Sequence, residues 1–100
     1  MTLDSLEMKI VQWGGDKGIL PDPDPVAQYE KTVEEVNELK EAIIFSDEHE
    51  VKDAIGDIFV TLVMQAQAWG YSMSECVEQA YNQIKDRKGQ MVDGQFVKEK

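Results

Sequence analysis

The chain is short of positive charge. Its 100 residues include 10 lysine and arginine residues against 20 aspartate and glutamate residues, which gives a formal net charge of -10. A general nucleic-acid-binding protein needs a basic surface to meet phosphate groups, so we expect no nucleic-acid partner. A ligand that carries phosphate is still compatible with this charge, because a bound metal ion reverses the local sign.

Cysteine and long apolar runs are also scarce. Cys76 is the single cysteine, which excludes an internal disulfide and favours a reducing compartment. The longest apolar run, Ile58 to Met64, is interrupted by Thr61 and is too short to span a membrane. The N-terminus lacks the basic segment followed by an apolar one that marks a secretory signal. We therefore expect a cytoplasmic protein that has no membrane partner.

The spacing of apolar residues predicts one all-α domain over residues 1–100. Apolar residues recur every three or four positions in four segments, at about 3–13, 25–45, 48–69 and 73–87. Residues suited to begin a helix precede these segments, namely Thr2, Asp24 followed by Pro25, Asp47, and Ser72. Glycine disfavours the helix interior, so the first and third helices are expected to end at Gly14-Gly15 and Gly70.

The later segments carry predictions about packing. The third is apolar around more than half of its circumference, which indicates a central helix. On the fourth, Cys76, Ala80 and Ile84 share an apolar stripe, so we expect them to face the core, with Cys76 as core filler rather than nucleophile. Asp93-Gly94 lies between short apolar pairs and predicts a two-residue β-hairpin. An isolated hairpin is marginally stable, so it should pack on the helices or on a partner.

Acidic residues cluster on the second and third predicted helices. The second carries Glu34, Glu35 and Glu38, and the third carries Glu50, Asp53 and Asp57. Residues three or four apart share a helix face, and antiparallel packing of the two helices would bring several carboxylates close together. Like charges at short range repel strongly, and a hard divalent cation, which prefers oxygen ligands, is the natural neutralising partner.

This pattern has a plainer interpretation as a solvated helix face. Lys31 can pair with the glutamates of the second helix, and Glu50 can serve in the first turn of the third. Asp53 and Asp57 have no such structural role, because both are poor helix formers inside a helix that otherwise looks buried. Gly56, also inside that helix, is easiest to explain if a backbone or a ligand approaches closely there. The balance favours a metal site.

Two further pairs of residues could contact a ligand. Trp13 could stack on a base while Gln12 reads the base edge, or Trp13 could simply anchor the core. Asn82 and Lys85 share a helix face and could contact phosphates, or Lys85 could simply favour a helix C-terminus. His49, the single histidine, fits no metal-ligand spacing and is expected at the surface.

Through these residues, the sequence resembles the MazG-like nucleoside triphosphate pyrophosphohydrolases of the all-α superfamily. The family motif, Glu-x-x-Glu followed after a spacer by Glu-x-x-Asp, is similar to Glu35-Val-Asn-Glu38 and Glu50-Val-Lys-Asp53. Similarity to small phage-type members extends over most of the chain, through Gln12-Trp13-Gly14, Asp53-Ala-Ile-Gly-Asp57 and Asn82-Gln-Ile-Lys85-Asp-Arg-Lys-Gly. In a second register Asp57 is the motif aspartate and Ala54 stands where glutamate is expected. We prefer Glu50 and Asp53 as the motif pair, with Asp57 as a ligand or a support for the ligands.

The resemblance implies a four-helix bundle assembled as a homodimer or a dimer of dimers. It also implies Mg²⁺-dependent hydrolysis of nucleoside triphosphates, chiefly deoxynucleoside triphosphates, between the α and β phosphates, in the service of nucleotide-pool house-cleaning. The metal ligands would come from Glu35, Glu38, Glu50, Asp53 and Asp57. Glu34 or Glu38 would position or deprotonate the attacking water, and Lys31 and Lys85 would stabilise the negative charge that develops on the phosphates.

Two alternatives differ from this hypothesis. A related pyrophosphohydrolase could act on dUTP or phosphoribosyl-ATP. The chain could also be a non-catalytic, acidic helical protein that binds a partner.

Overall fold

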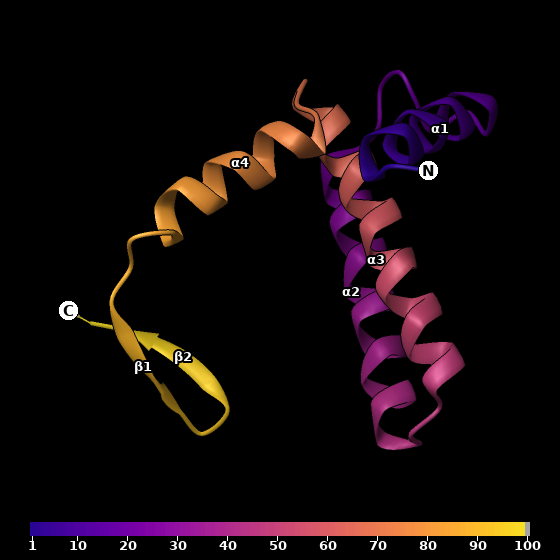
Figure 1. Cartoon of the computed structure of the whole chain (residues 1–100). Helices are drawn as coiled ribbons and strands as arrows, with labels where there is room; N and C mark the ends of the chain where they lie inside the picture. The colour runs from indigo at the N-terminus through magenta and orange to yellow at the C-terminus, as the bar shows by residue number, and fades with distance from the viewer. Residues whose placement is uncertain (100) are drawn as a thin grey trace.

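A computed structural model describes residues 1–99, and it is mostly helical, with a two-stranded antiparallel hairpin at the C-terminal end (Figure 1). The helices are α1 (Leu3–Asp16), α2 (Pro25–Ile44), α3 (Glu48–Ala68) and α4 (Met73–Ile84), and the strands are β1 (Gly89–Val92) and β2 (Gln95–Lys98). The predicted helical class with a terminal hairpin is confirmed. In the described part of the chain, no helix is both long and apolar enough to cross a membrane.

The predicted helix starts are confirmed. The side chains of Thr2, Asp24, Asp47 and Ser72 each accept a hydrogen bond from a backbone N–H in the first turn of the helix that follows. At Ser72 the Glu75 carboxylate also accepts from the backbone N–H, at 3.2 Å, which completes a capping box. Gly70 follows the end of α3 and has a φ angle of +80°, a left-handed conformation that glycine adopts without strain and that stops the helix from continuing.

Two predicted helix ends are wrong. Helix α1 continues through Gly14 and Gly15 to Asp16, and α4 ends at Ile84 rather than near residue 87. The reason at Gly14 is packing, because a Cβ added there would lie 2.7 Å from the Met64 Sδ atom of α3. This glycine therefore allows α1 and α3 to approach each other and does not stop the helix.

Helices α2 and α3 form an antiparallel pair, and α1 lies across one end of it (Figure 1). The fully buried side chains Val63 and Met64 come from α3, which contacts α1, α2 and α4 and is the central helix that the sequence predicts. Two hydrogen bonds join α2 to α3. The Thr32 and Thr61 hydroxyl oxygens lie 2.8 Å apart, and the Gln65 side-chain amide donates to the Pro25 carbonyl at 2.9 Å.

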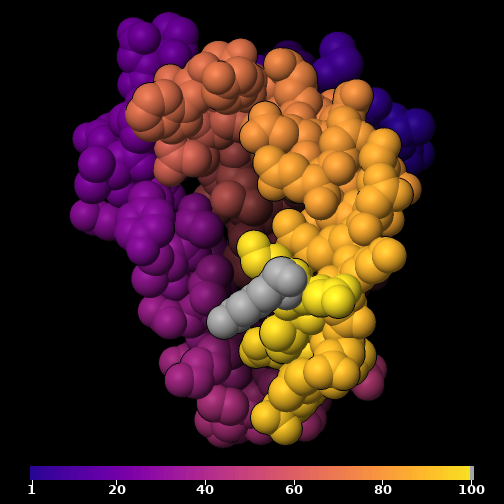
Figure 2. All heavy atoms as spheres, turned by 90° about the vertical axis from the view of Figure 1, so that its left-hand side faces the viewer, coloured from indigo at the N-terminus to yellow at the C-terminus, as the bar shows by residue number. Residues whose placement is uncertain are grey.

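Beyond Ser72 the chain leaves the other helices, and we call residues 73–99 the arm and residues 1–72 the body. Figure 1 shows α4 running away from α2 and α3 and ending in the hairpin, and Figure 2 shows the arm from its own side. Asp93 and Gly94 have φ angles of 50° and 82°, so the predicted two-residue turn is confirmed. Both strands are exposed along their whole length, and no residue of α4 is buried.

The prediction that Cys76, Ala80 and Ile84 face the core is wrong for the single chain. All three are exposed, and Ile84 keeps 51% of its surface. The stripe is apolar, but the hydrogen bonds that join α4 to the body lie in its first turn. There the Met73 N–H donates to the Glu7 carboxylate at 2.6 Å, and the Ser74 hydroxyl bonds the Asp4 carboxylate at 2.7 Å.

Candidate metal centre

Three carboxylates meet where α2 faces α3. Glu35 and Glu38 are one turn apart on α2, and Asp57 comes from the middle of α3. One oxygen from each of them lies within 4.8 Å of the others. Helical spacing accounts for the first two, and the antiparallel pairing of the helices brings in the third. We call these residues the carboxylate cluster.

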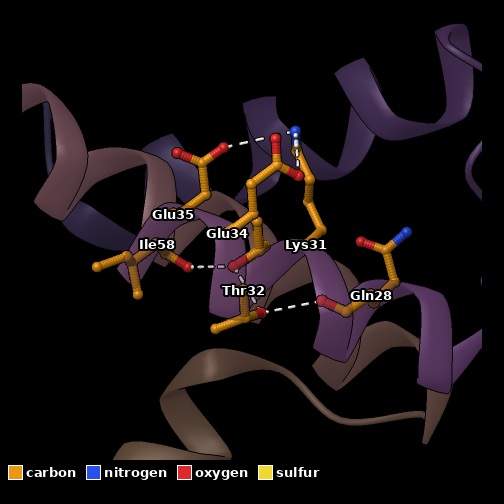
Figure 3. A network of polar contacts seen from close by, with 7 residues as sticks. Gln28, Lys31, Thr32, Glu34, Glu35 and Ile58 are labelled. Carbon is orange, nitrogen blue, oxygen red and sulfur yellow. Dashed lines mark hydrogen bonds and ion pairs between the residues drawn. The ribbon is translucent and has the colours of Figure 1, made fainter. Parts of the chain in front are cut away.

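Glu35 is the buried member of the carboxylate cluster. Its residue is 8% exposed, and its Oε2 atom is buried with no hydrogen-bond partner among the described residues. Its Oε1 atom lies 3.6 Å from the Lys31 ammonium, which also bonds the exposed Glu34 at 3.3 Å (Figure 3). A buried acceptor without a donor is costly, so the arrangement calls for a partner with positive charge.

The electrostatics of the cluster point the same way. Burial, followed by interaction with the nearby Glu38 carboxylate, raises the pKa of Glu35 above its ordinary value of 4.5, although Lys31 opposes the shift. Burial, followed by repulsion from Asp53 and Glu35, raises the pKa of Asp57 above its ordinary value of 3.8. Both carboxylates therefore hold protons more tightly than free side chains, and a bound cation would relieve the same repulsion.

The cluster fits a magnesium ion. Mg²⁺ takes oxygen ligands at about 2.0–2.1 Å, so opposite ligands of one ion stand roughly 4.2 Å apart. The three oxygens already lie within 4.8 Å of one another, and one of them belongs to a residue with an unpartnered buried oxygen. The donor set is all carboxylate, which suits a hard cation.

The other two predicted ligands lie outside this group. Asp53 is exposed and one turn before Asp57, close enough to raise the pKa of that residue. Glu50 lies in the first turn of α3, where its N–H donates to the Asp47 cap at 3.1 Å. The structure therefore places Asp57, rather than Glu50, opposite Glu35.

A pocket of about 450 Å³ opens beside the carboxylate cluster. Its lining includes the charged residues Glu35, Asp57 and Lys31, together with Trp13 and apolar residues such as Ile19, Val60 and Met64. Trp13 keeps 43% of its surface, so its ring borders the pocket and is not enclosed in the core. Along the antiparallel pair, Glu35 and Asp57 lie at one end of this lining and Ala27 and Met64 at the other, where Met64 approaches Gly14, the neighbour of Trp13. One end of the pocket is therefore charged, and the other is aromatic and apolar.

The remaining predicted site residues lie elsewhere in the single chain. Gln12 is exposed and does not line this pocket, although its neighbour Trp13 does. Asn82 and Lys85 belong to α4 and its C-terminal end, on the arm that diverges from α2 and α3 (Figure 1). His49 is exposed in the first turn of α3, as expected. An added Cβ at Gly56 meets no atom within 4 Å, so the expected close approach of this chain's own backbone there is wrong.

Sequence reasoning missed two polar residues of the pocket, Gln28 and Thr61. Gln28 begins a stripe that continues through Lys31 to Glu35, and Thr61 follows Asp57 by four residues. Extending the acidic stripes by one turn in each direction would have found both. Thr61 is buried and donates to the Ile58 carbonyl at 2.7 Å, while its oxygen accepts from the Thr32 hydroxyl.

Comparisons with known proteins match the part of the chain that holds the carboxylate cluster. The family model described as MazG nucleotide pyrophosphohydrolase domain matches residues 25–92, which include the whole carboxylate cluster. An uncharacterized 18.2 kDa protein of the rep-hol intergenic region of Haemophilus phage HP1 (strain HP1c1) is 35% identical over 65 residues. That alignment covers 65% of this chain and 40% of the phage protein, so the match spans less than half of the relative. No solved structure matches the chain.

Proposed function

This chain belongs to the family of MazG nucleotide pyrophosphohydrolase domains, and we propose that it hydrolyses nucleoside triphosphates, with deoxynucleoside triphosphates as the main substrates, in the presence of Mg²⁺. The bond broken is the one between the α and β phosphates, and the products are a nucleoside monophosphate and pyrophosphate. The proposed role is control or cleaning of the nucleotide pool in the cytoplasm.

The carboxylate cluster carries this proposal. Glu35, Glu38 and Asp57 would hold the ion, with Asp53 next to them on α3. When bound, magnesium supplies positive charge against the phosphates and lowers the pKa of water in its coordination sphere. Without a cation, the buried and unpartnered Oε2 atom of Glu35 has no structural purpose that the fold explains.

The pocket supports a nucleotide as the ligand. Its volume of about 450 Å³ suits a small molecule of drug size. The Trp13 ring offers an aromatic face on which a base could stack, and Gln28 offers donor and acceptor groups at the base edge. Lys31 lies between this end and the carboxylates, where its ammonium would contact phosphate oxygens. The base would occupy the apolar end, and the triphosphate would reach the cluster.

We propose Glu38 as the residue that positions the attacking water and accepts its proton. It is the exposed member of the cluster, so water reaches it freely. Glu34 is the less suitable choice, because one of its oxygens is bound by Lys31 at 3.3 Å (Figure 3). The water oxygen forms a bond to the α phosphorus, and the bond from that phosphorus to the oxygen bridging the α and β phosphates breaks. The proton of the water passes to the Glu38 carboxylate. Pyrophosphate leaves, and the carboxylate later returns the proton to solvent.

The test is a panel of ribo- and deoxynucleoside triphosphates, with dUTP and phosphoribosyl-ATP included, assayed with Mg²⁺ for monophosphate and pyrophosphate. Glu38→Gln should reduce turnover by about 100-fold or more, as expected for loss of a general base. Glu30→Gln is the matched control, since it removes an equal charge from an exposed position on another face of α2. Release of orthophosphate in place of pyrophosphate, or equal activity of the two variants, would refute the proposal.

We also propose that the chain assembles as a homodimer or homotetramer, as the family resemblance implies. Asn82 and Lys85 are retained as substrate contacts on this basis alone, because in one chain they lie on the arm. Their role in catalysis therefore depends on a neighbouring copy that brings an arm to the carboxylate cluster.

A further inference from the structure

Lys31 is the one basic residue that forms ion pairs in the described part of the chain. Its ammonium lies 3.3 Å from Oε2 of Glu34 and 3.6 Å from Oε1 of Glu35 (Figure 3). Lys31 is also the one basic residue among those that line the pocket beside the carboxylate cluster. The ammonium therefore lies where the proposed metal ion and the proposed triphosphate would both bind.

Lys31 neutralises Glu35 only in part. The 3.6 Å between the ammonium and Oε1 exceeds the length of a charge-assisted hydrogen bond, which is about 2.7–2.9 Å. The second carboxylate oxygen of Glu35, Oε2, is buried and has no hydrogen-bond partner among the described residues. A cation held by the carboxylate cluster would therefore compete with the ammonium for Glu35 and would neutralise it more fully.

The two partners of Lys31 differ in their relation to the carboxylate cluster. Glu35 belongs to the cluster and its side chain is 10% exposed, whereas Glu34 lies outside the cluster and its side chain is 59% exposed. An ammonium at Glu35 is repelled by a divalent ion on the same carboxylate, because like charges at short range repel strongly. The pair with Glu34 is compatible with that ion, so Glu34 keeps the ammonium near the pocket.

The surroundings of Lys31 determine where its ammonium goes when it leaves Glu35. The side chain is 51% exposed and its four-carbon stem is flexible, so the ammonium can turn away and stay hydrated. The acidic residues that line the pocket are Glu35 and Asp57, and both belong to the carboxylate cluster. When these carboxylates hold a metal ion, the anion left for the ammonium in the pocket is a phosphate of the nucleotide.

We infer, on the basis of the proposed function, that Lys31 exchanges partners as the ligands bind. In the metal-free protein its ammonium pairs with Glu35 and Glu34. It leaves Glu35 when Mg²⁺ binds the carboxylate cluster, remains beside Glu34, and then binds the phosphates of the nucleotide. Lys31 therefore opposes the binding of Mg²⁺ alone and favours the binding of nucleotide once Mg²⁺ is present, so it couples the two binding events.

The first test is isothermal titration calorimetry of the full chain with Mg²⁺ alone, and then with a non-hydrolysable α,β-methylene deoxynucleoside triphosphate in Mg²⁺. Lys31→Met should tighten the binding of Mg²⁺ alone by about 5-fold, which corresponds to the loss of a competing exposed ion pair. The same substitution should weaken the binding of the analogue by about 10-fold or more, because a charge-assisted hydrogen bond to phosphate is lost.

Lys40→Met is the matched control for these titrations. It removes the same charge from an exposed position on α2, and Lys40 forms no ion pair with the described residues. It should change both affinities by less than about twofold, because an exposed charge without a partner is largely screened. Equal effects of Lys31→Met and Lys40→Met on both affinities would overturn the inference.

Nuclear magnetic resonance of the lysine side chains distinguishes an exchange of partners from a fixed charge. In the metal-free protein the Lys31 ammonium should be more restrained than that of Lys40. Mg²⁺ alone should make it more mobile, and the analogue should restrain it again. A Lys31 signal that does not respond in a chain that binds Mg²⁺ would overturn the exchange and leave the proposed hydrolysis intact. A native chain that binds no Mg²⁺ would overturn both.

Discussion

Replacing Glu35 by glutamine separates a metal site from an ordinary helix face. Glutamine preserves the shape of the side chain, removes the buried charge and supplies an amide donor next to Glu38 and Asp57. A carboxylate pair at 4.8 Å repels by about 3.5 kcal/mol at an effective dielectric constant of 20, and by about 0.9 kcal/mol in bulk water. Glu38 is exposed and Asp57 half-buried, so the lower part of this range applies.

We therefore expect Glu35→Gln to stabilise the metal-free protein by about 1–3 kcal/mol, which raises Tm by on the order of 5–15 °C. In the native protein, Mg²⁺ at about 100 times its Kd should add about 2.7 kcal/mol by binding the folded state, and the variant should lose this gain. The assay is thermal unfolding at pH 8 in EDTA and in Mg²⁺, with Glu30→Gln as the control. The reasoning is refuted if Glu35→Gln lowers Tm in EDTA while Mg²⁺ raises the Tm of the variant and of the native protein equally.

Two further predictions follow from the same structure. Folding raises the pKa values of Glu35 and Asp57, so the folded state binds protons at these carboxylates more tightly than the unfolded state does. The stability of the metal-free protein should therefore fall as the pH rises from the ordinary pKa values of 4.5 and 3.8 through the raised ones. Denaturant melts in EDTA across this interval would show the fall, and excess Mg²⁺ at neutral pH should restore the loss. Gly14→Ala should cost about 1–3 kcal/mol because the new Cβ meets Met64, whereas Gly15→Ala, in open space, should stabilise α1 by about 1 kcal/mol. Equal effects of these two substitutions in urea melts would contradict the packing argument.

Local features of the fold could be predicted from sequence because they depend on neighbouring residues. A cap such as Asp24 satisfies backbone N–H groups two and three residues away, so it needs no distant partner to be recognised. Asp93-Gly94 sets its turn by backbone conformation alone. Gly14 shows where this reasoning fails. Its helix propensity predicted a stop, but its contact with Met64, fifty residues later, decides its role.

The sequence also contained a geometric reason to place Asp57, rather than Glu50, opposite Glu35. In an antiparallel helix pair, residues equally distant from the connecting loop face each other, and here the loop is centred near Ser46. Glu35 stands 11 residues before Ser46 and Asp57 stands 11 residues after it, whereas Glu50 stands only four after it. At a rise of 1.5 Å per residue, Glu50 lies about 10 Å along α3 from Asp57. Motif spacing alone identified the acidic face but not the turn that meets α2.

The direction of α4 could not be predicted in the same way. An apolar stripe shows that a helix face will be covered, and the sequence predicts such a stripe on α4 through Cys76, Ala80 and Ile84. It does not show in which direction the helix runs, because any apolar surface could cover such a face. That direction follows from the short connection after Gly70, together with Asp4 and Glu7, which bind the start of α4. Those contacts join residues about seventy positions apart, and nothing in the local pattern around Asp4 marks it as the residue that directs the arm.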